Sequence, residues 1–209
     1  MKWFSMSMIV AAAASSIVCF ADDVKVFEKP DVGFPGSSHS EEIPDWLARW
    51  ELARCLTILK RYDEAIVDYR LVVDAKPDLH EARLELAQVL VWHDRKTEAS
   101  GLLEEIKTDS LTVGDIALLA DIHKILEQYD LAAPLYRAVL DAKPDDHQTR
   151  LKLAEMLSWQ KKYEESLSEY RTLLEALPQD TQVRRKYAMV LIWAGKHEEA
   201  IPELRQTLP

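Results

Sequence analysis

The fold is decided by the stretch Leu153-Ala154-Glu155-Met156-Leu157-Ser158-Trp159 and by the Tyr163-Glu164-Glu165-Ser166 that follows it. Its apolar residues recur at intervals of three and four, which is the spacing of one face of an α-helix. Two small residues, Ala154 and Ser166, lie twelve positions apart. The pattern recurs along the chain at offsets of 34, 33, 34 and 34 residues, which identifies a tandem repeat. The five units are marked by Leu52, Leu86, Leu119, Leu153 and Tyr187.

Each unit predicts two packed helices. In the second helix a small residue is followed four positions later by a large one, and three units close on a proline. The small residue lets the two helices approach closely, and the large residue packs into the next unit. The small–large pairs are Ala65–Tyr69, Ala99–Leu103, Ala132–Tyr136, Ser166–Tyr170 and Ala200–Leu204, and the prolines are Pro77, Pro144 and Pro178.

The pattern predicts an all-α fold, an α-solenoid of about five helix-turn-helix repeats that forms a right-handed superhelix. One residue is missing between the second and third units, and the polar segment 108–114 follows, so we expect a looser junction there. The expected helices are 45–59, 62–75, 79–93, 96–107, 113–126, 129–142, 147–160, 163–176, 181–194 and 197–207.

The first 44 residues differ from the repeats in composition. Residues 1–21 combine a basic start, an apolar stretch and small residues before the expected cleavage point, which predicts a signal peptide. Residues 22–44 are rich in Pro, Gly and Ser, which predicts an extended or disordered linker. The repeat domain is then expected to span 45–209. This organisation predicts export to the periplasm, with association to the outer membrane left open.

The cysteines bear on membrane attachment and disulfide bonding, and the net charge bears on the class of partner. An uncleaved anchor or a lipid on Cys19 is the alternative for the N-terminus, and either would supply the chain's membrane contact. Cys55 would be the single cysteine after cleavage, so no internal disulfide is expected and a buried, inert thiol is predicted. The formal net charge of −10 argues against a nucleic-acid partner.

No catalytic residue, metal site or cofactor is predicted. The six histidines do not form a metal-binding spacing, and the sequence lacks a nucleophile elbow and a phosphate loop. His123 takes a core position of its repeat, so a packed histidine with a hydrogen-bond partner is expected. The sequence therefore favours a binding function over an enzymatic one.

Three tryptophans, Trp92, Trp159 and Trp193, occupy the same column near the end of a first helix. Two interpretations stay open: a packing wedge between helix pairs, or a ladder of exposed aromatic platforms that bind a peptide or stack on sugar rings. The side chains expected to line the same concave groove for partner binding are Trp50, Arg54, Gln88, Asp121, Lys124, Gln148, Glu155 and Met189.

In these columns the chain resembles the tetratricopeptide repeat superfamily. Within it, the string from Ala154 to Trp159 and from Tyr163 to Ser166 is similar to repeats in bacterial envelope proteins, such as the periplasmic scaffolds of exopolysaccharide export. The resemblance implies a non-enzymatic scaffold that holds a protein partner of the cell envelope while a secretion or export machine assembles. The tetratricopeptide domains that bind chaperone tails have a recurring set of Lys, Asn and Arg residues. This chain lacks such a set, because Arg54, Gln88 and Asp121 stand in one of its columns, so the resemblance does not imply that class of partner.

Two other functions remain as alternatives. The array could be a glycan-binding module in which the tryptophan ladder stacks on a polysaccharide. It could also be a pilotin-like assembly factor for a pilus or secretin, which requires the lipid on Cys19. At the C-terminal end the apolar side chains Ile201, Leu204 and Leu208 have no following helix in the sequence, so we expect self-association, a docked partner or a frayed end there.

Overall fold

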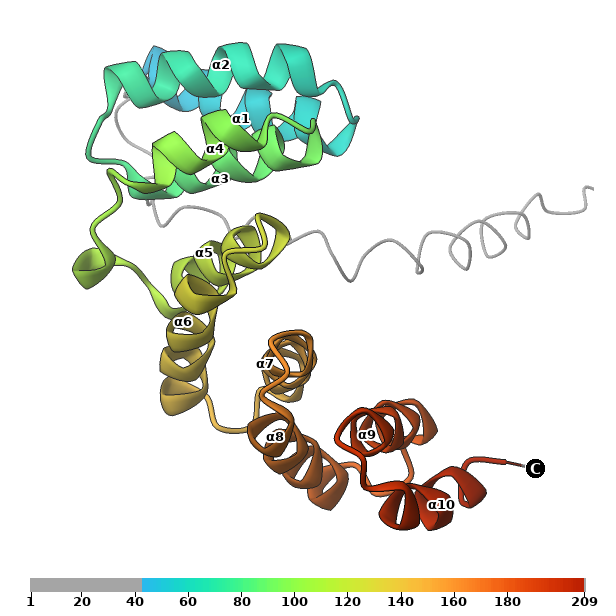
Figure 1. Ribbon diagram of the computed structural model, residues 1–209. Helices are drawn as coiled ribbons and strands as arrows, with labels where there is room; N and C mark the ends of the chain where they lie inside the picture. The colour runs from blue at the N-terminus through green and yellow to red at the C-terminus, as the bar shows by residue number, and fades with distance from the viewer. Residues whose placement is uncertain (1–42, 209) are drawn as a thin grey trace, which may run out of the picture. The chain divides into compact units, whose positions relative to one another are not determined.

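The structure is a computed structural model that describes residues 43–208, except for the side chain of Asp109. The expected signal peptide, the lipid on Cys19 and nearly all of the expected linker lie outside the described residues. Within them the chain forms α-helices and no strand, arranged as consecutive antiparallel pairs (Figure 1). The helices are α1 Asp45–Ile58, α2 Tyr62–Ala75, α3 His80–Trp92, α4 Lys96–Leu103, α5 Val113–Ile125, α6 Tyr129–Ala142, α7 His147–Trp159, α8 Tyr163–Ala176, α9 Thr181–Trp193 and α10 His197–Arg205.

The repeat columns account for the packing of these pairs. The small residues of both helices are buried in every pair, and Tyr69, Tyr136 and Tyr170 are among the largest fully buried side chains. Each helix packs on its pair partner, and α2, α6 and α8 also pack on the first helix of the following pair. The core therefore continues from one pair to the next, and the prediction of an all-α repeat solenoid is confirmed.

An arginine fixes the proline turn that precedes the first helix in three of the pairs. The guanidinium of Arg83 donates to the carbonyl oxygen of Pro77 at 3.2 Å and to Glu105 of the same pair at 2.6 Å. Arg150 and Arg184 make the equivalent contacts, to Pro144 and Pro178 at 2.9 Å each. Each turn is thus tied to the helix that follows it, and the same arginines pair with Glu105 after α4, Glu169 of α8 and Glu203 of α10.

The junction between the second and third pairs departs from this arrangement. Helix α4 ends at Leu103, four residues earlier than the sequence predicts, and a 3-10 turn, η1 (Thr108–Ser110), leads to α5. Here α5 packs mainly on α3, the first helix of the preceding pair. At the other junctions the next pair packs on the second helix of the preceding pair, which is α2, α6 or α8. The short α4 follows from Ser100-Gly101 in its middle, since glycine and serine are weak helix formers. This agrees with the looser junction expected from the missing residue.

The turn inside each pair contains a left-handed residue. Lys60, Asp94, Glu127 and Lys161 have φ between 59° and 61°, and Gly195 has φ 77°. A left-handed residue after a helix redirects the chain and lets the last carbonyls find donors. Only the fifth pair of the described array places glycine, the residue best suited to this conformation, at that position.

Cys55 corrects one prediction, because its side chain is exposed rather than buried. The equivalent residues of the later first helices, such as Val89 and Met156, are buried because a preceding pair covers them. Helix α1 is the first described helix and has no such cover. Separately, none of the helices in residues 43–208 has the length and hydropathy to cross a bilayer.

Candidate functional site

The last residue of every first helix belongs to one partly exposed apolar column. We call it the tryptophan column, and its members are Ile58, Trp92, Ile125, Trp159 and Trp193. The indoles of Trp159 and Trp193 are 51% and 50% exposed, and Trp92 is partly buried. Large apolar side chains left partly in water at equivalent positions are candidates for a contact surface.

Tyrosines support two of these indoles from the preceding pair. Tyr62, the first residue of α2, has its ring centroid 6.3 Å from that of Trp92, with an interplanar angle of 45°. Tyr129, the first residue of α6, lies 5.9 Å from Trp159 at 50°. Tilted aromatic pairs of this kind are favourable and fix ring orientation. Trp92 and Trp159 therefore pack against a tyrosine of the preceding pair, as the packing interpretation expects, and Trp159 also leaves half of its surface in water.

A carboxylate and a polar group accompany the column at three junctions. His93 Nε2 lies 2.9 Å from Asp63 Oδ1, and Gln160 Nε2 donates to Asp130 Oδ1 at 2.9 Å. The third pair joins Lys196 to Glu164 at 2.8 Å. The first two pairs link the start of a second helix to the residue that follows the next first helix, and the third links α8 to the residue before α10. We call these three pairs the polar rim of the column.

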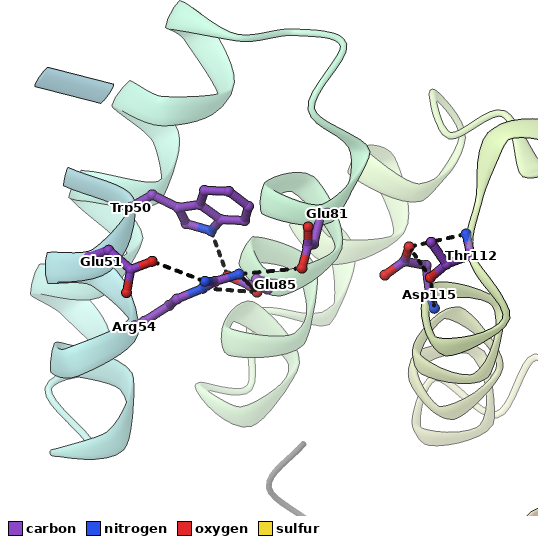
Figure 2. A network of polar contacts seen from close by, with 7 residues as sticks. All are labelled: Trp50, Glu51, Arg54, Glu81, Glu85, Thr112 and Asp115. Carbon is purple, nitrogen blue, oxygen red and sulfur yellow. Dashed lines mark hydrogen bonds and ion pairs between the residues drawn. The ribbon is translucent and has the colours of Figure 1, made fainter. Parts of the chain in front are cut away.

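Trp50 and Arg54 do not line an open groove, which corrects the prediction. Both are buried, and Figure 2 shows them converging on Glu85 of the next pair. Trp50 Nε1 donates to Glu85 Oε2 at 2.7 Å, and the Arg54 guanidinium donates to Glu85 Oε1 at 2.7 Å. The Arg54 guanidinium also stacks 4.0 Å from the centroid of the Trp50 ring. These side chains join the first pair to the second.

The acidic neighbours of Arg54 dominate its electrostatics. Glu51 lies 3.1 Å from the guanidinium and Glu81 3.4 Å from it (Figure 2). Burial alone lowers the pKa of Arg54, but the hydrogen bond and charge of Glu85, together with these two carboxylates, raise its pKa above the ordinary value. The residue is therefore a permanent buried cation, and its role is to pair with Glu85. Thr112 and Asp115, also drawn in Figure 2, form the capping box of α5.

Two further predicted groove residues make ion pairs with the same 31-residue separation. Asp121 lies 2.8 Å from Lys152 of the next pair and accepts a 2.6 Å hydrogen bond from the Tyr136 hydroxyl. Glu155 pairs in the same way with Lys186. Repeated pairs in one register act as bridges between neighbouring repeats. The sequence prediction assigned these residues to partner binding and missed their bridging, although a search for opposite charges 31 residues apart would have found it.

The remaining predicted residues divide by exposure. Gln88 is buried, which removes it from an open groove, and the side chain of Lys124 is partly buried. Gln148 and Met189 are exposed, like Trp159 and Trp193. The accessible part of the predicted site is therefore the tryptophan column with its polar rim. In residues 43–208 no three His, Cys, Asp or Glu side chains are grouped to hold a metal ion.

A pocket of about 410 Å³ lies between α2, α3 and α4, and one of about 340 Å³ lies at the looser junction. The second is lined by apolar side chains of α4, α5 and α6 together with His123. His123 Nδ1 lies 2.7 Å from Gln128 Oε1, and burial lowers the pKa of this histidine against the opposing effect of that hydrogen bond. The packed, partnered state expected for His123 is observed.

Comparisons with known proteins identify the class of this repeat. Family models described as tetratricopeptide repeat match residues 126–190 and 38–80. The chain belongs to the tetratricopeptide repeat superfamily. No curated protein gave a significant match.

Solved structures of the same fold cover most of the chain. MamA MSR-1 is 25% identical, with a TM-score of 0.68 over 78% of this chain and 94% of that one. MamA AMB-1 is 24% identical, with a TM-score of 0.66 over 78% and 96%. YrrB, described as a tetratricopeptide protein with an unusual peptide-binding site, is 18% identical, with a TM-score of 0.67 over 78% and 84%. The finer resemblance to exopolysaccharide-export scaffolds stays a prediction.

Proposed function

We propose that the protein is a non-enzymatic scaffold that holds a segment of another protein along the tryptophan column. The observation that carries this proposal is the half exposure of Trp159 and Trp193 at equivalent ends of α7 and α9. The Trp159 ring packs against Tyr129 on one side, so a partner meets a ring that is already oriented. Aromatic side chains fixed in this way lose little conformational entropy on binding and often dominate interface energies.

The stacked pairs supply preorganisation. The buried bridge from Trp50 and Arg54 to Glu85, and the ion pairs of Asp121 and Glu155, hold successive repeats in one register. A partner segment can then contact several column positions without reordering the array. That YrrB is described as binding a peptide supports a peptide-like ligand for this chain as well.

We place this scaffold in the cell envelope, in the assembly of a secretion or export machine. The support is the signal-peptide pattern of residues 1–21 and the similarity of the repeat string to envelope proteins. Fractionation of cells that produce the protein with an unmodified N-terminus tests the location. Recovery of the full-length, uncleaved chain in the cytoplasm would contradict it.

Site-specific photo-crosslinking in the native cell tests the scaffold. We place the probe at Ile125, which is an exposed member of the column and avoids replacing a tryptophan. The matched control is a probe at Ser168, an exposed residue of α8 outside the column. A discrete protein adduct from Ile125 and none from Ser168 is expected. Equal adducts from both positions, or none from Ile125 in folded protein, would refute a protein ligand on the column.

A glycan ligand is the second candidate, favoured by one specific feature. The exposed indole of Trp159 lies beside the Asp130–Gln160 pair, and an aromatic platform with an adjacent carboxylate and amide suits sugar rings and their hydroxyls. Electrophoresis through gels containing soluble glucans tests it. Retardation that disappears in Trp159→Ala and persists in Leu131→Ala supports the glycan, whereas unretarded migration across a broad glycan panel excludes it.

A further inference from the structure

The first described helix exposes a face that is buried in every later pair. The equivalents of Leu52, which are Leu86, Leu119, Leu153 and Tyr187, are all buried, whereas Leu52 is 48% exposed. The same holds for Cys55, which is exposed although Val89, Ile122, Met156 and Val190 are buried. We call Leu52 and Cys55 the entry face. It keeps the apolar character of a repeat–repeat interface, and no repeat within residues 43–208 covers it.

The last described helix exposes the other half of the same interface. Ile201 of α10 is 50% exposed, whereas its equivalents Ile66, Ala133 and Leu167 are buried. Leu204 is partly exposed in the column where Tyr69, Tyr136 and Tyr170 are buried. We call Ile201 and Leu204 the exit face. At the internal junctions with a full second helix, the helices that carry these columns, α2, α6 and α8, pack on the first helix of the next pair.

Charges at the two faces are complementary in the register of the internal junctions. Two ion pairs link residues 28 positions apart across junctions: Arg70 with Glu98, and Arg137 with Glu165 at 2.6 Å. One repeat beyond the array, the same columns contain Arg205 on α10 and Glu64 on α2. Arg61 holds Glu64 at 2.5 Å, as Arg95 holds Glu98 at 2.7 Å. Glu64 is therefore oriented like the carboxylate that receives Arg70.

We propose that a second copy of this chain docks its exit face on the entry face and continues the repeat register from one molecule to the next. Ile201 and Leu204 of one copy then cover Leu52 and Cys55 of the next, and Arg205 pairs with Glu64 of the next copy. The interface is heterologous, because it joins different faces, so it adds copies in a line. The inference does not depend on the proposed function, since it leaves the tryptophan column out of the contact.

The association is concentration-dependent, because two molecules lose translational and rotational freedom that an internal junction does not. Sedimentation velocity of the purified protein from about 1 µM to about 1 mM covers the affinities expected of so small an interface. Leu52→Asp removes the entry face and Ile201→Asp the exit face. Both side chains are about half exposed, so both variants should fold, and circular dichroism checks this. Leu131→Asp, at an exposed apolar residue outside both faces, is the matched control.

The expected result is a set of oligomers for the wild type and Leu131→Asp, and a monomer for each face variant alone. An equimolar mixture of the two face variants forms dimers and nothing larger, because each keeps one intact face. Wild-type protein that stays monomeric throughout overturns the proposal, as does a mixture without dimers. Oligomers that persist in Leu52→Asp or Ile201→Asp would assign association to another surface and also overturn it.

Exchanging the charges of Arg205 and Glu64, and labelling the thiol of Cys55, test the proposed register in two independent ways. Arg205→Glu should weaken association at least several-fold, and adding Glu64→Arg in the same chain should restore part of it. Maleimide labelling of Cys55 should slow as the wild type associates and should stay fast in Ile201→Asp. Association that is indifferent to Arg205→Glu, or labelling of Cys55 that is independent of concentration, contradicts the register.

Discussion

At the residue scale, the left-handed turn residues are the clearest departure from local preference. Lys161 has φ 61°, which costs a side-chain-bearing residue about 1 kcal/mol relative to glycine. Lys161→Gly should therefore raise the free energy of unfolding by up to about 1 kcal/mol in urea titrations. Lys162→Gly is the matched control, since Lys162 has φ −81° and gains nothing from glycine. Equal effects of the two changes would show that the turn is not strained.

The buried Arg54–Glu85 pair predicts a large stability change. Arg54→Leu leaves the Glu85 carboxylate buried with Trp50 as its remaining described donor from the first pair, which should cost about 3 kcal/mol or more. Arg49→Leu breaks the more exposed pair with Asp68 and should cost about 1 kcal/mol or less. Chemical denaturation compares them. A loss below about 1 kcal/mol for Arg54→Leu would mean that this network does not hold the first two pairs together.

His123 predicts a pH dependence of stability. Burial holds its folded-state pKa below the ordinary value of about 6.5, so the unfolded chain takes up the proton first as the pH falls. Its contribution should be present above about pH 6.5 and diminish as the pH falls through that value. The difference in unfolding free energy between wild type and His123→Gln should shrink accordingly. The exposed His197→Gln is the control, and a difference that grows on acidification would reverse the assignment.

At the scale of elements, the first helices of the last three pairs carry side-chain caps and the second helices do not. Asp180 accepts from the backbone N–H groups of Gln182 and Val183 at the start of α9. Asp180→Ala should lower the unfolding free energy by about 1 kcal/mol, and Asp180→Asn by only a few tenths. Thermal melts of the two variants measure this. Equal losses would point to a charge effect instead of a cap.

The elements were largely predictable from sequence, and the contacts between them were not. Helical periodicity and the small–large columns predict most helix ends to within one or two residues of the observed ends. They do so because the same boundary pattern occurs in all five units. The predicted end of helix α4 is wrong, because Ser100-Gly101 and the missing residue occur in one unit only and the other repeats carry no sign of them. The burial of Trp50 and Arg54 was missed because it depends on Glu85, a single residue in the next repeat. The tryptophan column was found because its register is the register of the repeat.

At the scale of the whole molecule, the repeat interface and the tryptophan column differ in which side chains are exposed. Apolar columns that face a neighbouring pair are buried wherever a pair is present, and they stay exposed at α1 and α10. The tryptophan column differs, because Trp159 is half exposed although its pair, α7 and α8, packs on a neighbouring pair on both sides. The exposed apolar side chains at α1 and α10 therefore predict binding of further copies of this chain. The exposed side chains of the tryptophan column predict binding of a different protein.

The most direct test of the central claim is the yield of the protein adduct from the Ile125 photo-probe in a Trp159→Ala/Trp193→Ala background. Truncating tryptophans at an interface commonly costs about 2 kcal/mol or more each, so the yield at limiting protein should fall at least about tenfold. The unfolding free energy should change much less than the ~3–5 kcal/mol of a core tryptophan. An unchanged adduct yield in the folded variant would contradict binding on the tryptophan column.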